Sequence, residues 1–263
     1  MRVSVITTTY NSPLFLKKVL DGFLLQKEAP HEFIIADDGS ETDTAQVIKS
    51  FSERAPFPVL HIWQEHKGFR AARIRNKALN QSSGDYIILL DGDCVVNSSF
   101  ISDHMSLSEE GCFIQGKRIL VKKNASADFT HAHANSFASL VKFALTGKIS
   151  NIHHLIRLPF LPPVKNRSLN NIKSCNMSFF KKDLLAVNGF NEDFVGWGNE
   201  DSELVCRFFK YGLTKKVHHF MSLCFHLWHP ANKIVSEKNR QLLSDSIASK
   251  EYYCRNGLIK GSY

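Results

Sequence analysis

The chain has 263 residues, of which 43% are hydrophobic and 22% are charged, a composition that allows a sizeable core and excludes a disordered or fibrous protein. Lys and Arg number 33 against 25 Asp and Glu, a formal net charge of +8, which indicates either an anionic partner or simply a basic surface. The sequence has no apolar run of about 18 residues and does not open like a signal peptide, so we expect a cytoplasmic protein without a membrane-spanning helix.

Short strand signals alternate with longer helix signals along the first half of the chain. The predicted strands are 3–6, 33–36, 59–63 and 86–90. The helices between them are marked, in order, by the start signal Ser12-Pro13, by the apolar stripe Ala45, Ile48 and Phe51, and by residues 70–80. This alternation predicts an α/β fold whose Rossmann-like, mainly parallel sheet is flanked by helices.

Polar residues follow three of these strands at the point where each strand ends. The clusters are 7–11, 37–40 and 91–93. Ligands of largely parallel sheets bind beyond the carboxyl ends of the strands. We therefore expect the three clusters to meet at one edge of the sheet.

The second half of the chain has a less regular pattern. It predicts strands at 112–121, 174–180 and 218–228, helices at 125–145, 199–211 and 235–253, and a long loop at 148–173. Gly212 stands where a glycine commonly ends a helix. The loop mixes five basic residues with apolar ones, and long loops in compact domains are usually functional or disordered.

Three motifs carry chemistry in the first half. Asp91 and Asp93 offer oxygen ligands that suit Mg²⁺ or Mn²⁺ together with phosphate, although most such pairs are turn residues. Asp38 belongs to a turn-like Asp-Asp-Gly-Ser cluster and can accept hydrogen bonds from a base or a ribose. Arg70 and Arg73 share a helix face. They are expected either to bind a base or a diphosphate or to belong to an ordinary solvated surface.

The stretch 194–201 is the most unusual in the chain. Gly196 and Gly198 flank Trp197, and Glu200 and Asp201 follow at a helix start. Glycine lets a backbone approach a ligand closely, and the Trp ring offers a flat apolar face to a sugar. Carboxylates at a helix start are also ordinary stabilising residues.

The order of these motifs carries a resemblance. The sequences Thr-Thr-Tyr-Asn, Asp-Asp-Gly-Ser, Gly-Phe-Arg-Ala-Ala-Arg and Asp-Gly-Asp resemble family 2 glycosyltransferases of the GT-A fold. The later segments 175–178 and 189–201 are similar to a C-terminal region shared by bacterial chondroitin-type polymerases and animal β-1,4-galactosyltransferases. The resemblance implies a GT-A fold with a C-terminal acceptor-side lobe.

The resemblance also implies a nucleotide-sugar donor, usually a UDP-sugar. The residues that it assigns to donor binding are Thr8, Tyr10, Asp38, Arg70, Asp91 and Trp197. Among these, Asp91 is expected near the ribose or the donor sugar, and Trp197 at the donor or acceptor sugar.

A metal ion and a pair of carboxylates complete the implied site. Asp93 is expected to bind Mn²⁺ or Mg²⁺ together with His229, with His226 as the alternative ligand. Asp201 is expected to be the general base of an inverting transfer, and Glu200 to bind sugar hydroxyls.

These expectations define one enzyme and two alternatives. The enzyme moves a sugar of the Gal, GalNAc or GlcNAc type from a UDP-sugar to a hydroxyl of a glycan or lipid-linked glycan in cell-surface polysaccharide synthesis. The first alternative is a non-catalytic nucleotide-sugar-binding partner protein, which the intact acidic motifs disfavour. The second is a nucleic-acid-binding protein, which the dispersed basic residues disfavour.

The same resemblance suggests a division of the chain. We expect residues 1–96 to form the nucleotide-sugar-binding half and 97–232 to form the metal and acceptor half of the same domain. The basic and apolar residues of 148–173 predict, within the second half, a mobile acceptor-side loop that touches an anionic membrane at the inner face of the cell or a lipid-diphosphate acceptor. The alternative is an ordinary surface loop whose apolar residues pack on the core. Residues 233–263 are expected to form a helical tail.

Overall fold

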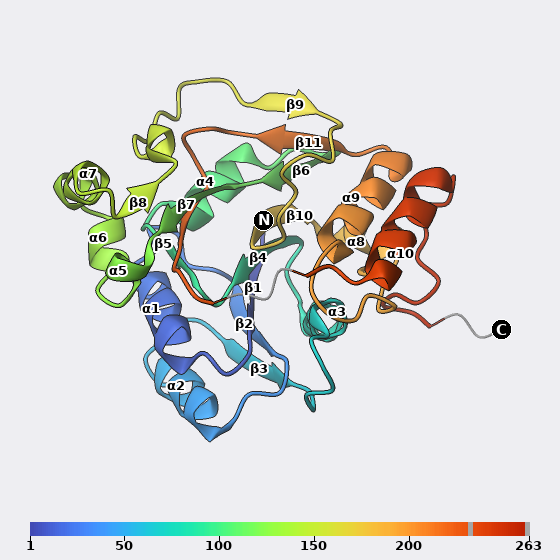
Figure 1. Cartoon of the computed structure of the whole chain (residues 1–263), viewed down its shortest axis with the longest axis horizontal. Coiled ribbons are helices and arrows are strands. Elements are labelled where there is room, and N and C mark those ends of the chain that lie inside the picture. The colour runs from blue at the N-terminus through green and yellow to red at the C-terminus, as the bar shows by residue number, and fades with distance from the viewer. Residues whose placement is uncertain (231–233, 261–263) are drawn as a thin grey trace.

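The computed structural model describes residues 1–230 and 234–260. The strands form a sheet of eight, in the order β3-β2-β1-β4-β10-β6-β11-β9, and a sheet of four, in the order β5-β12-β7-β8 (Figure 1). The strands are β1 (Val3–Thr9), β2 (Glu32–Asp37), β3 (Val59–Trp63), β4 (Tyr86–Asp91), β5 (Cys94–Val96), β6 (Cys112–Gln115), β7 (Lys117–Val121), β8 (Ile149–Ser150), β9 (Val164–Asn166), β10 (Asn176–Phe180), β11 (Thr214–Val217) and β12 (Leu223–His226). The helices are α1 (Pro13–Phe23), α2 (Thr42–Ser52), α3 (Ala71–Gln81), α4 (Phe100–Leu107), α5 (Lys123–Ser126), α6 (His131–Ala134), α7 (Phe137–Leu145), η1 (Ile152–His154), α8 (Lys181–Ala186), α9 (Glu200–Tyr211) and α10 (Glu237–Ala248).

Helices cover both faces of the eight-stranded sheet because side chains alternate along its central strands. In β1, Val5 belongs to the core beneath α1 and α2, whereas Ile6 belongs to the core beneath α3 and α9. β1 pairs in parallel with β2 and β4, and β2 pairs in parallel with β3. The predicted α/β architecture of the first half is therefore confirmed.

One predicted core position in α2 is wrong. Ala45 is exposed, and Thr44 is buried in its place. The residues that face the sheet are Thr44, Ile48 and Phe51, which follow the i, i+4, i+7 spacing of one helical stripe.

Two predicted strands are wrong: the chain divides the first between the two sheets, and only part of the second is a strand. Segment 112–121 forms β6 and β7 with a bend at Gly116, where a Cβ would lie 2.3 Å from Cγ of Asn176. Segment 218–228 contributes only β12, and it is preceded by β11 and by a bend at Ser222, whose φ is 53°. Because β11 lies parallel to β6 and β12 parallel to β7, two neighbouring segments pass together from the larger sheet into the smaller one.

The predicted helix 125–145 is also wrong, because capping residues divide it into α5, α6 and α7. Thr130 forms a capping box with His133 at the start of α6. The Oγ of Ser136 accepts a hydrogen bond from the backbone N of Ser139 at 3.3 Å and starts α7. Hydroxyl side chains in these positions satisfy the free N–H groups of a new helix rather than prolonging the previous one.

The remaining C-terminal elements differ from the prediction mainly in their bounds. The predicted loop 148–173 contains β8, η1 and β9. Helix α9 ends at Gly212, whose φ of 113° confirms the predicted glycine cap. Helix α10 occupies the middle of the predicted helix 235–253, and the start and the last three residues of the expected tail lie outside the described residues. In the described parts of the chain, no helix is both long enough and apolar enough to cross a bilayer.

A buried arginine joins the two halves of the molecule. Arg75 of α3 has only 4% of its side chain exposed. One terminal nitrogen lies 3.1 Å from Oε1 of Glu200, the first residue of α9, and the other lies 3.3 Å from Oδ1 of Asp91, the last residue of β4. The guanidinium also lies over the ring of Phe190, 5.4 Å from its centre. The start of α9 is thereby held against the end of β4.

Replacing Arg75 with Met tests this joint. The substitution leaves Asp91 and Glu200 without their cation, and breaking a buried ion pair from one side typically costs about 3–5 kcal/mol. We expect urea unfolding to show a loss of this order in the free energy of unfolding. As the control, Arg240→Met removes an exposed pair with Glu237 and should change this free energy by less than about 1 kcal/mol. Equal losses in the two variants would contradict the role of Arg75.

Candidate active site

The polar clusters at the strand ends meet at one edge of the larger sheet, as predicted. The Oγ1 of Thr8 donates a hydrogen bond to Oδ1 of Asp91 at 2.9 Å. The backbone N of Asp38 donates to the carbonyl of Thr9 at 3.0 Å, and the backbone N of Gly92 donates to the carbonyl of Thr8 at 2.8 Å. A Cβ at Gly92 would lie 2.8 Å from that carbonyl oxygen, so this close approach requires glycine.

Asp38 organises the part of the site assigned to the nucleotide. Its buried carboxylate accepts hydrogen bonds from Nε2 of Gln64 at 2.5 Å and from the backbone N of Arg70 at 2.8 Å. The Arg70 side chain itself donates to the carbonyl of Glu65, and its Nε is buried without a partner in the described structure. Asp38 and Arg70 are therefore adjacent, but through the backbone rather than through an ion pair.

An aromatic surface lies beside this carboxylate. The ring of Tyr10 stacks on the ring of His66, with 4.0 Å between centres and 12° between planes, and 41% of Tyr10 is exposed. The Nδ1 of His66 lies 2.9 Å from the carbonyl oxygen of Asp38. This geometry offers a flat, partly open face next to a hydrogen-bond acceptor, which suits a nucleotide base.

Asp93, His226 and His229 form a compact set of metal-ligand atoms. β12 pairs antiparallel with β5 so that His226 is opposite Cys94, the residue after Asp93. The Oδ2 of Asp93 lies 2.9 Å from Nε2 of His229 and 3.5 Å from Nε2 of His226. The ligand atoms all lie within 4.8 Å of one another. One carboxylate oxygen and two imidazole nitrogens fit a divalent transition metal such as Mn²⁺ with further positions open for a substrate, and the geometry permits both histidines to serve.

The same contacts set the charge of this group. Burial favours the protonated form of Asp93, but the hydrogen bond from His229 and the charges of both imidazoles outweigh it and hold the pKa of Asp93 below its usual value. The hydrogen bond to Asp93 raises the pKa of His229. The carboxylate is therefore ionised and available for a cation at neutral pH.

Glu200 and Asp201 begin α9 in different environments. Burial and the neighbouring Asp201 raise the pKa of Glu200, against the opposing charge of Arg75. The Oδ2 of Asp201 accepts a 3.3 Å hydrogen bond from the backbone N of Ser174, while Oδ1 accepts a 2.7 Å bond from the N of Ser202. The Oγ of Ser202 also donates to Oδ1 of Asp201, at 3.3 Å, and the side chain of Asp201 is not fully buried.

Asp91 connects the donor edge to these carboxylates. Burial raises its pKa to about 6, even though Arg75 lowers it. Its backbone N donates a 3.4 Å hydrogen bond to the carbonyl of Cys175, and Cys175 follows the residue that binds Asp201. The carboxylates at the ends of β4 and at the start of α9 consequently belong to one site.

The Gly-Trp-Gly segment stands beside the same region. The backbone N of Gly196 donates to the carbonyl of Phe69 at 2.8 Å, and Phe69 precedes Arg70 in the chain. Gly196 and Gly198 have φ values of 84° and 100°, which favour glycine. Trp197 between them is 40% exposed, so its ring is open to a ligand.

Sequence reasoning missed Arg75, Gln64 and His66. Arg75 left a usable signal, because it shares the buried stripe of its helix with Ala72 and Leu79, and a cation in such a stripe needs an anionic partner. Gln64 and His66 left none, because they stand in a loop whose path only the folded chain defines.

Comparison with known proteins agrees with this geometry. Residues 4–179 match the family model described as glycosyl transferase family 2, and residues 163–230 match a model described as the N-terminal domain of galactosyltransferase. Hyaluronan synthase of Pasteurella multocida is 29% identical over 230 residues, which cover 80% of this chain and 23% of that protein. The chain spans about half or less of the length of the first curated relatives that it matches.

Solved structures share the fold at low sequence identity. S. aureus TarS 1-349 in complex with UDP-GlcNAc has a TM-score of 0.67 at 16% identity and matches 94% of this chain and 66% of its own. Mannosyltransferase PcManGT from Pyrobaculum calidifontis, in complex with GDP-Man and Mn²⁺, has a TM-score of 0.60 at 15% identity, with 88% and 58% covered. Because the family model matches more than half of the residues, the chain belongs to glycosyl transferase family 2 and is a glycosyltransferase with the GT-A fold.

Proposed function

We propose that the chain transfers a sugar from a UDP-sugar to a hydroxyl group of a glycan or lipid-linked glycan, with inversion at the anomeric carbon. The observation that carries this proposal is the buried bridge of Arg75, which holds Glu200 and its neighbour Asp201 against the strand end that bears Asp91. The UDP-GlcNAc named for the TarS structure supports a UDP-sugar, and the GDP-Man named for PcManGT supports a nucleotide-sugar in general. A donor sugar of the Gal, GalNAc or GlcNAc type and a role in cell-surface polysaccharide synthesis complete the proposal.

The nucleotide binds along the edge formed by β1 and β2. The buried carboxylate of Asp38 accepts from the uracil N–H, and its backbone N is bonded to the carbonyl of Thr9, the residue after Thr8 at the end of β1. The exposed ring of Tyr10 stacks on the base. Arg70, whose backbone N is bonded to Asp38, contributes a positive charge to the nucleotide.

The diphosphate lies next to Asp93, His226 and His229. A divalent cation held by these three residues would stabilise the charge that develops on the leaving diphosphate. Asp93 contributes an ionised carboxylate. The Nδ1 of His229 lies 3.0 Å from the carbonyl oxygen of Pro230, which orients the imidazole and leaves Nε2 for the cation. Asp91, whose oxygen accepts from Thr8, faces the ribose or the donor sugar.

The transfer is a single displacement. The acceptor oxygen forms a bond to C1 of the donor sugar while the bond from C1 to the diphosphate oxygen breaks, and that electron pair leaves with UDP. The hydroxyl proton passes to Asp201, whose carboxylate is bound mainly by backbone amides and therefore retains acceptor capacity. Arg75 positions Glu200, which binds the sugar hydroxyls. Trp197 packs its exposed face against a sugar ring.

The proposal extends to an anionic membrane surface. Residues 129–182 contain no Asp or Glu, so the charge of this segment is entirely basic. It also bears the large, exposed apolar side chains Phe137, Leu145, Ile152, Ile156 and Phe160. Basic residues interspersed with exposed apolar ones suit the headgroup region of anionic lipids.

Replacing Asp93 with Ala tests the metal site. The variant loses the only carboxylate of the ligand set, so we expect calorimetry to show weaker binding of Mn²⁺. Because a catalytic cation supplies several kcal/mol, the rate of UDP release from UDP-sugars should fall by roughly 100-fold or more. Chelation of the wild type with EDTA should have the same effect, and added Mn²⁺ should reverse it. His31→Ala, on the exposed surface, is the control. Full turnover after chelation would rule out a required cation.

Replacing Asp201 with Asn tests the general base. The amide preserves the shape of the side chain but cannot take the proton, and its single oxygen can accept only one of the two backbone hydrogen bonds. We therefore expect kcat to fall by roughly 10²–10⁴-fold. Donor binding, followed by thermal shift with UDP, should be unchanged, because Asp201 stands on the acceptor side. Asp128→Asn, an exposed change of equal charge, should leave kcat unchanged. A kcat near that of wild type in Asp201→Asn would remove Asp201 from this role.

Liposome flotation tests the membrane contact. Wild-type protein should float with vesicles that contain anionic lipid and not with neutral vesicles, because the acid-free segment supplies attraction at the surface. Replacing Leu145, Ile156 and Phe160 together with Ser should reduce the floating fraction several-fold, since burial of apolar area is lost. A protein that remains with the unbound fraction in both vesicle types would exclude this contact.

A further inference from the structure

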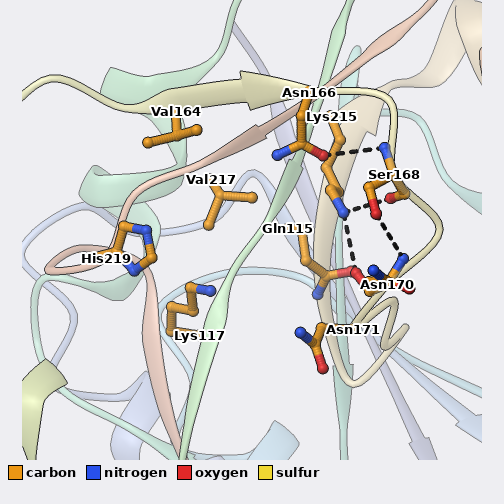
Figure 2. A pocket seen from close by; sticks show the side chains of 10 residues that line it. All are labelled: Gln115, Lys117, Val164, Asn166, Ser168, Asn170, Asn171, Lys215, Val217 and His219. Atoms are coloured by element: carbon orange, nitrogen blue, oxygen red, sulfur yellow. Dashed lines mark hydrogen bonds between the residues drawn. The ribbon is translucent and has the colours of Figure 1, made fainter.

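A cavity of about 210 Å³ lies outside the site described above, where β11 and β9 end the strand order of the larger sheet (Figure 2). β9 and β11 form two of its walls, and the turn from β6 to β7 forms another (Figure 2). The loop that follows β9 closes one end. The residues that line it are Gln115, Lys117, Val164, Asn166, Ser168, Asn170, Asn171, Lys215, Val217 and His219.

The walls of this cavity are basic and contain no acid. Two lysines, Lys117 and Lys215, and one histidine, His219, line it together with side-chain amides. The Nζ of Lys215 donates to the carbonyl oxygens of Ser168 and Asn170, at 2.5 and 3.0 Å. Lys215 therefore holds the loop after β9 in place, and its charge is not neutralised.

Lys117 is the free cation of this group. Its side chain is partly buried in the cavity wall, and within the described residues its ammonium has neither a hydrogen bond nor an ion pair. Burial lowers the pKa of Lys117, and burial together with the Lys117 charge lowers the pKa of Lys215. Partly buried cations that repel one another without a counter-ion favour the binding of an anion.

The cavity opens on the same edge of the sheet as the active site. β10 runs antiparallel to β4, β6 antiparallel to β10, and β11 parallel to β6. The last residues of β6 and β11, Gln115 and Val217, thus lie at the edge where β4 ends with Asp91. The strands themselves bring the cavity wall to the carboxyl ends that form the site.

A short segment of chain connects the cavity to Asp201. Gln115 accepts a 3.0 Å hydrogen bond from the backbone N of Lys173, and the next residue, Ser174, donates its N to Asp201. Asn171 of the cavity wall precedes Ser174 by three residues, so their Cα atoms are at most about 11 Å apart. That distance corresponds to one or two sugar units.

We propose that this cavity binds a carboxylate or phosphate group of the acceptor glycan, one or two sugar units away from the hydroxyl that reacts at Asp201. The proposal rests on the function proposed above and adds the chemical class of the acceptor. The ammonium of Lys117 supplies a charge-assisted hydrogen bond, and the amide of Asn166, on another wall of the cavity, supplies N–H groups (Figure 2). The volume equals that of roughly seven water molecules, which accommodates an anionic group with part of its sugar ring.

Binding of small probes to the full chain tests the proposal, with neither nucleotide nor metal present. The probes are methyl glucuronide and glucose 6-phosphate as anions and methyl glucoside as the neutral match, followed by ligand-observed NMR. We expect at least one anion to bind wild-type protein roughly 10-fold more tightly than the glucoside, the effect of one hydrogen bond to a charged group. Preference for the carboxylate or for the phosphate identifies the source of the anion, and either preference supports the proposal.

Variants locate the binding. Lys117→Gln should weaken the binding of the anionic probe roughly 10-fold and leave the binding of the glucoside unchanged. Lys117→Arg should retain the affinity for the anionic probe. Lys27→Gln removes an exposed charge elsewhere and should behave as wild type, and thermal unfolding of each variant verifies folding. Two results would overturn the proposal: equal affinities for the anionic and neutral probes, or an affinity for the anion that Lys117→Gln does not change.

The failure of this proposal is distinguishable from the failure of the proposed function. UDP release by the wild type in the presence of Mn²⁺ is measured in a separate assay. A protein that releases UDP but does not discriminate the anionic probes refutes the anion-binding cavity alone. A protein that binds the anions through Lys117 but does not release UDP from any UDP-sugar refutes the proposed transfer, and with it the assignment of the anion to an acceptor.

Discussion

The buried guanidinium of Arg75 is the interaction on which the site depends. It reaches Asp91 at the end of a strand in the first half and Glu200 at the start of a helix in the second half. Two carboxylates cannot remain ionised and close together inside a protein without a cation between them. The planar fork of arginine can contact both acids at once, which the single ammonium of lysine cannot do. The end of β4 and the start of α9 are thus positioned by electrostatics as well as by packing.

The carboxylates of the site differ because their partners differ. Burial raises the pKa of Asp91 to about 6 and that of Glu200 above its usual value, whereas two imidazoles keep the pKa of Asp93 low. A site of this kind can separate metal binding, sugar binding and proton acceptance among side chains of the same type. The passage of two neighbouring chain segments from one sheet to the other, at Gly116 and Ser222, adds the basic cavity at the same edge.

The first half of the fold was predictable from the sequence and the second half only partly so. Strand and helix periods in residues 3–90 are clean because each element stays in one sheet or on one face. Segments 112–121 and 218–228 read as single strands, since an apolar run does not reveal the residue at which a strand leaves its sheet. Gly116 marks one such point, but its necessity comes from the side chain of Asn176, which lies sixty positions away in the sequence.

The sequence by itself determined the family, the α/β class of the first half and the polar clusters at the strand ends, because motifs and periodicity are local properties of the chain. Only the tertiary structure decided that both His226 and His229 face Asp93, that Arg75 joins Asp91 to Glu200, and that an acid-free cavity adjoins the site. The physical reason is that charge pairing and coordination depend on distances of a few ångströms between residues far apart in the chain, and such distances exist only once the two sheets have packed.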